Sequence, residues 1–226
     1  MVADMNTMHT REQGSILAAA ERHALVWMAK RLPPWVSSDQ LTLLGFTAML
    51  LAGVGYWLAN RNPLALWLVV VGLAVNWFGD SLDGTLARVR DRQRPRYGFY
   101  VDHVLDLVGA FFLLSGLALS GYMSPFLALG LLVAYLMVNA ELFLATHVQR
   151  VFCLSFLSIG PTELRIILAV GTLCLLHKPW VHLGSIGVFR LFDVGGMIAI
   201  AGLALRLVVS AIRNTCDLYL AERLPQ

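Results

Sequence analysis

Four aspartates in the middle of this chain have the spacing expected of a metal site. Asp80 and Asp83 are three residues apart and Asp102 and Asp106 are four apart, so each pair shares one face of a helix. Carboxylates are costly at membrane depth and need partners there. Oxygen ligands without a nearby cysteine suit hard cations such as Mg²⁺ or Mn²⁺. We therefore predict that both pairs converge on one site, which has room for two metal ions and a substrate phosphate.

A run of arginines offers these aspartates another role. Five arginines alternate with other residues between Arg88 and Arg96, and they could pair with the acids as a salt-bridged surface. The aspartates have helical spacing, however, whereas the arginines lie in the connecting stretch. This difference favours the metal site.

The elements that carry the aspartates belong to a membrane protein. Of the 226 residues, 58% are hydrophobic and 14% are charged, and the mean hydropathy is +0.70. Long apolar runs recur at 41–60, 64–78, 107–123, 125–140, 166–177 and 194–205. We predict an all-α integral membrane protein with six transmembrane helices. Asp80 and Asp83 extend the second helix beyond its apolar part.

An amphipathic segment precedes the first apolar run. Residues 11–31 place apolar side chains at helical spacing among charged ones, which predicts an interfacial helix or, alternatively, a solvated tail. Pro33 and Pro34 end it, and Ser37 begins a group of capping residues. We expect a cytosolic N-terminal part over 1–36 and one membrane domain over 37–226. Residues 1–30 do not resemble a cleavable signal, so we expect a mature start.

The basic residues indicate the orientation. Arginines and lysines precede the first apolar run and follow the second, which places both of these loops, and the aspartates beside them, on the cytosolic side. Organelle signals are absent from the sequence, which favours a prokaryotic cytoplasmic (inner) membrane. Cys153, Cys174 and Cys216 lack C-x-x-C spacing and indicate neither a zinc site nor disulfides.

At the aspartates the chain resembles the CDP-alcohol phosphotransferase (CDP-alcohol phosphatidyltransferase) family. The family motif is D-x-x-D-G-x-x-A-R followed by G-x-x-x-D-x-x-x-D. This sequence matches every fixed position, with Asp80, Asp83, Gly84, Ala87, Arg88, Gly98, Asp102 and Asp106. Nine residues separate Arg88 from Gly98, a slightly longer gap than is usual. Upstream, Ser38-Asp39-Gln40-Leu41-Thr42 departs from the P-N-x-L-T of many members.

The resemblance implies a reaction and a set of roles. A hydroxyl would attack the phosphorus of a CDP-linked substrate, and CMP would leave. The four aspartates would bind Mg²⁺ or Mn²⁺, with Asp106 also the leading candidate for the general base. CDP would bind at Gly84, Ala87, Arg88 and Gly98. The expected partners are a CDP-linked substrate, lipid, the bilayer and a second copy in a homodimer, with no nucleic acid.

His103 is a second candidate for the catalytic base. The Asp102-His103 pair resembles the D-H-G stretch of cholinephosphotransferases and ethanolaminephosphotransferases, although Val104 replaces the glycine. Histidine titrates near neutrality, but this position points about 100° away from Asp102 on a helix.

Four further residues are candidates for the acceptor or headgroup site: Glu141, His147, Glu163 and Arg165. The stretch around Glu163 resembles the aminoalcohol branch of the family, and no base precedes Glu141. These features favour choline or ethanolamine chemistry with diacylglycerol. The alternative is a CDP-diacylglycerol-dependent phosphatidyltransferase that uses inositol, inositol phosphate, glycerol phosphate or serine. A cation or proton transporter is an alternative of another class.

Overall fold

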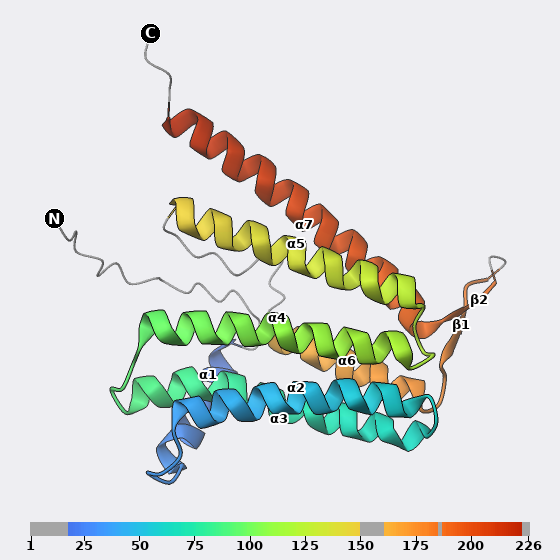
Figure 1. The fold of residues 1–226 in the computed structure, drawn as a ribbon, viewed down its shortest axis with the longest axis horizontal. Coiled ribbons are helices and arrows are strands. Elements are labelled where there is room, and N and C mark those ends of the chain that lie inside the picture. Colours follow the sequence, from blue (N-terminus) through green and yellow to red (C-terminus); the bar gives the residue numbers. More distant parts are fainter. Residues whose placement is uncertain (1–17, 150–160, 185–186, 223–226) are drawn as a thin grey trace.

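The computed structural model describes residues 18–149, 161–184 and 187–222, which fold as a bundle of long helices (Figure 1). The helices are α1 (Ala18–Arg31), α2 (Ser38–Ala59), α3 (Leu66–Val89), α4 (Pro95–Leu119), α5 (Pro125–Gln149), α6 (Pro161–Leu175) and α7 (Leu191–Ala221), with a short 3₁₀ helix, η1 (Pro63–Ala65). The expected start of the first apolar helix is confirmed, because Ser37 caps α2 and forms a capping box with Gln40.

Five helical segments among the described residues are long and apolar enough to cross a membrane: α2, η1 with α3, α4, α5 and α7. The predicted integral membrane protein is therefore confirmed at this level. The sixth expected span is covered by α6, which has 15 residues. At about 1.5 Å per residue this helix is roughly 22 Å long, shorter than the roughly 30 Å hydrocarbon core. A sixth span therefore stays a prediction.

Two features differ from the sequence-based expectation. The all-α fold class is supported, with the addition of a short antiparallel hairpin of β1 (Trp180–His182) and β2 (Val188–Arg190) between α6 and α7. The last helix, expected over 194–205, extends to Ala221. Apolar periodicity marks only the central part of such a helix, because its ends are polar.

Glycines bring α2, α3 and α4 into close contact. A Cβ at Gly79 of α3 would lie 2.6 Å from the carbonyl oxygen of Leu41 on α2. A Cβ at Gly116 of α4 would lie 2.0 Å from the carbonyl oxygen of Gly53 on α2. Both distances are shorter than atoms tolerate, so only glycine permits this packing. The aspartates of α3 and α4 are thereby drawn to the same end of α2.

The remaining helices lie around these three. α6 packs against α3, and the buried hydroxyl groups of Tyr56 on α2 and Thr172 on α6 share a hydrogen bond of 2.7 Å. α5 and α7 run side by side and form a separate layer in Figure 1, with α4 between them and α2. The site therefore has α2, α3 and α4 as its frame, and α5 and α6 as its flanks.

The N-terminal helix α1 is tied to this frame. Leu25 and Ala29 are buried against Leu82 and Leu86 of α3. Glu21 accepts hydrogen bonds from Trp77 and Ser81 of α3 and from Thr162 of α6. Residues 11–17 of the predicted amphipathic segment lie outside the described residues, and the interfacial position of α1 stays a prediction.

Candidate metal centre and active site

A pocket lies between α2, α3 and α4, and all four motif aspartates line it. Its other lining residues are Thr42, Gly45, Phe46, Met49, Asn76, Leu105 and Gly109. The empty space measures about 310 Å³, part of it open to solvent. The two helical faces predicted from the 3 and 4 spacing do meet at this pocket, because α3 and α4 both pack against α2.

Three of the aspartates form a tight acidic group. Carboxylate oxygens of Asp80, Asp102 and Asp106 all lie within 4.8 Å of one another. Like charges at this distance repel strongly in a low-dielectric site unless a cation or a proton neutralises them. Oxygen donors alone, each partly buried, fit a hard divalent cation. The donor set is therefore suited to Mg²⁺ or Mn²⁺.

Asp83 is held separately from that group by the start of α2. The Thr42 hydroxyl donates to Asp83 Oδ2 at 2.5 Å, and the Ser38 hydroxyl donates to the Asp83 carbonyl oxygen at 2.9 Å. The backbone N–H of Gly84 donates to Asp83 Oδ1. These contacts fix one oxygen of Asp83 toward α2. Ser38 and Thr42 had no role in the sequence-based prediction, since the stretch departs from the usual family pattern.

Arg165 of α6 reaches the acidic group from the flank. Its Nη2 atom lies 2.6 Å from Asp80 Oδ2, and only 13% of the Arg165 side chain is exposed. Removing either partner of an ion pair this well buried would leave the other charge unpaired, which would strongly destabilise the protein. The structure thus places one of the four predicted acceptor-site residues beside the metal site.

Tyr135 of α5 is a further neighbour that sequence reasoning missed. It interacts electrostatically with Asp106, Asp80 and Arg165. Tyr135 lies in the apolar first part of α5, before Asn139 and Glu141, so the sequence contained no spacing signal for it. Tyr135 and Arg165 thus bring side chains of α5 and α6 near the aspartates, although neither residue lines the pocket.

The family comparison agrees with this geometry. The model of the CDP-alcohol phosphatidyltransferase family matches residues 35–209. The chain belongs to this family. Its members generally depend on metal, and they are membrane enzymes that use CDP-linked substrates. The alternative of a cation or proton transporter is therefore set aside.

One curated relative has a more specific name. The chain is 34% identical over 112 residues to archaetidylinositol phosphate synthase from Pyrococcus horikoshii. The alignment covers 47% of this chain and 56% of the relative, so the chain spans just over half the length of that protein. The expected preference for aminoalcohols gains no support from this comparison.

The geometry explains why the aminoalcohol evidence was weak. His103 does not line the pocket. Its Nδ1 atom lies 2.7 Å from the Phe99 carbonyl oxygen, and its ring stacks on Phe99 at 4.2 Å and meets Phe143 of α5 edge-on at 5.5 Å. The ring of His103 therefore lies between α4 and α5, and its role as a base stays a prediction.

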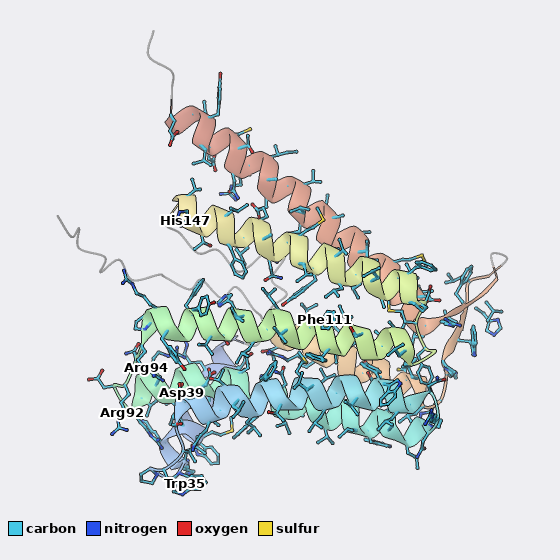
Figure 2. The ribbon with its side chains drawn as sticks, viewed as in Figure 1. Trp35, Asp39, Arg92, Arg94, Phe111 and His147 are labelled. Atoms are coloured by element: carbon cyan, nitrogen blue, oxygen red, sulfur yellow. The ribbon has the colours of Figure 1, made fainter. Side chains whose placement is uncertain are left out.

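The other predicted acceptor residues are not gathered at the pocket. Glu141 of α5 accepts hydrogen bonds from Ser210 and Asn214 of α7, at 2.7 to 3.0 Å. Exposed His147 lies at the end of α5, apart from Asp39 and Arg94 (Figure 2). Half-buried Glu163 stands two residues before Arg165 on α6. Of the four, Arg165 is the one that meets the aspartates.

The predicted CDP-binding residues lie at the mouth of the site. Gly84, Ala87 and Arg88 continue α3 beyond Asp83, and Arg88 Nη2 donates to Thr85 Oγ1 at 2.9 Å. Gly98 is exposed near the start of α4, where an added Cβ would meet nothing within 4 Å. Arg94 and Asp39 form an exposed ion pair beside it (Figure 2). None of these residues lines the pocket, so their role in binding CDP stays a prediction.

Proposed function

We propose that this enzyme transfers a phosphatidyl-type group from a CDP-linked lipid to a hydroxyl of a small soluble polyol that itself carries a phosphate, such as inositol phosphate. CMP is the leaving product. The observation that carries this proposal is Arg165, a guanidinium held beside the acidic group on the flank of the pocket. An arginine binds phosphate through charge-assisted hydrogen bonds. The similarity to archaetidylinositol phosphate synthase supports the same class of acceptor.

The aspartates have two roles in this proposal. Asp80, Asp83 and Asp102 would serve mainly as metal ligands, and Asp106, also a candidate ligand, would take the proton of the attacking hydroxyl. Bound Mg²⁺ or Mn²⁺, in a pair of ions, would neutralise the diphosphate and the charge that builds on its bridging oxygen. Thr42 holds Asp83 in place, so that its carboxylate does not have to reorganise during the reaction.

Arg165 changes partner in this scheme. In the structure, Arg165 is paired with Asp80. The site has four carboxylates and this one guanidinium, so negative charge is in excess. Metal binding by Asp80 would weaken the attraction between its carboxylate and the Arg165 guanidinium. The guanidinium then offers its donors to the phosphate of the acceptor. A polyol without phosphate gains nothing from this contact.

The proposal also covers where CDP binds, which side of the membrane the site faces and how the protein assembles. CDP binds over Gly84, Ala87, Arg88 and Gly98 at the polar end of α3 and the start of α4. This end faces the cytosol, in a prokaryotic cytoplasmic membrane, because the basic residues gather there. A homodimer is the proposed assembly.

A comparison of acceptors tests the proposal. Purified enzyme in detergent with CDP-diacylglycerol and Mn²⁺ would be given inositol phosphate, glycerol phosphate, inositol or serine. A parallel reaction would combine CDP-choline or CDP-ethanolamine with diacylglycerol. We expect CMP release to be fastest with a phosphorylated polyol. Faster release with an unphosphorylated alcohol or with the aminoalcohol pair would contradict the proposal.

Arg165→Ala gives the matching variant. We expect KM for the phosphorylated acceptor to rise roughly 10- to 100-fold, because charged hydrogen bonds contribute about 1.5–3 kcal/mol. KM for the CDP-linked donor should change little. Arg206→Ala on α7 is the control, since it removes an arginine from a spanning helix away from the pocket lining. An equal rise for both substrates in Arg165→Ala would show that the arginine does not recognise the acceptor phosphate.

A further inference from the structure

Asn76 is a buried polar residue that the proposed mechanism does not use. It lies on α3, one turn before Asp80, and only 4% of the residue is exposed. It lines the same pocket as the four aspartates. Among the described residues, its Oδ1 is the buried side-chain oxygen or nitrogen that has no hydrogen-bond partner. An unsatisfied buried acceptor costs free energy, so this atom calls for an explanation.

The orientation of the Asn76 amide follows from its neighbour. Nδ2 donates to the carbonyl oxygen of Gly45 on α2 at 3.0 Å. A carbonyl oxygen can only accept, so the amide nitrogen must face it and the amide oxygen must face elsewhere. The close approach of α2 and α3 at Gly45 and Gly79 holds this arrangement. The amide oxygen of Asn76 is thus fixed in orientation, and it belongs to a residue of the pocket lining.

The protein offers this oxygen no hydrogen. The pocket lining also includes Phe46, Met49, Leu105 and Gly109, whose side chains have no donor group. The Thr42 hydroxyl, also in the lining, already donates to Asp83. A water molecule would need space about 2.8 Å from Oδ1, and this atom has essentially no solvent-accessible surface. A magnesium ion binds oxygen at about 2.0–2.1 Å and needs less room.

We infer that Asn76 Oδ1 is an additional oxygen donor for the divalent cation at the inner end of the aspartate site. This inference rests on the metal site of the proposed function and adds a ligand outside the aspartate motif. Asn76 lies about 6 Å further from the polar end of α3 than Asp80 does. A neutral amide is less costly than another carboxylate at that depth and adds a ligand without adding charge.

Binding of Mn²⁺ to the purified full-length protein tests the inference without requiring turnover. Free Mn²⁺ would be measured by electron paramagnetic resonance, with Asn76→Leu as the variant of similar size that lacks the oxygen. We expect its Mn²⁺ affinity to fall roughly 10- to 100-fold. Asn139→Leu is the control, because its Nδ2 also donates to a backbone carbonyl but it does not line the pocket. Its affinity should match wild type.

Asn76→Asp is a second test variant, which keeps the inference testable if Asn76→Leu does not fold. This variant keeps an oxygen and adds a buried charge, so we expect a lower melting temperature without metal and a larger rise on adding Mn²⁺ than in wild type. Wild-type affinity in folded Asn76→Leu, or an Mn²⁺-induced rise in Asn76→Asp no larger than in wild type, would overturn the inference. If wild-type protein itself binds no Mn²⁺, the metal site of the proposed function fails as well.

Discussion

Each motif aspartate has its own surroundings, although the sequence presents them as equivalent. Asp80 is paired with Arg165, Asp83 is fixed by Thr42, and Asp102 and Asp106 face Asp80 across the pocket. An aspartate that must accept a proton needs access to the substrate hydroxyl more than it needs fixed partners. The division into metal ligands and one base is therefore a question that single substitutions can answer.

Asp106→Asn and His103→Phe separate the two candidates for the base. We expect Asp106→Asn to lower kcat roughly 10²- to 10⁴-fold at saturating Mn²⁺, because general-base catalysis contributes about that much. His103→Phe should keep kcat within a few-fold, since the ring of His103 packs between Phe99 and Phe143. Initial rates of CMP release measure both. The reverse pattern, an active Asp106→Asn and an inactive His103→Phe, would assign the base to His103.

At the scale of elements, glycines decide where the aspartates lie. The α2–α4 contact at Gly53 and Gly116 and the α2–α3 contact at Gly45 and Gly79 fix the frame of the pocket. In a membrane, small residues allow this packing because the hydrophobic effect does not drive helices together there. Displacement of α4 would move Asp102 and Asp106 away from Asp80.

Gly116→Ala tests this role of the frame. Its Cβ would lie 2.0 Å from the Gly53 carbonyl oxygen, so we expect α4 to shift, with a loss of stability of about 1–3 kcal/mol. Melting temperature and Mn²⁺ affinity should both fall. Gly202→Ala on α7 is the control, because a Cβ there meets nothing within 4 Å, and alanine favours helix by up to about 1 kcal/mol. Similar behaviour of the two variants would contradict this account of the frame.

At the scale of the whole molecule, the sequence predicted the local features well and the distant contacts poorly. Helical spacing was sufficient to place the aspartates on two facing helices, and apolar runs located the spans. The contact between Arg165 and Asp80 joins residues 85 apart in sequence, and no periodicity indicates it. Glu141 was expected at the acceptor site, but it is hydrogen-bonded to α7, since the partner of a spanning helix cannot be read from its own residues.

The central claim is that a metal site built from α3 and α4 transfers a group from a CDP-linked lipid. Its most direct test is CMP release by the purified enzyme from CDP-diacylglycerol with a phosphorylated polyol, with and without Mg²⁺ or Mn²⁺. We predict one CMP per phospholipid formed, strict dependence on the divalent ion, and loss of at least about 100-fold in Asp83→Asn. CMP release that persists in a chelator, or in Asp83→Asn at the wild-type rate, would contradict the account.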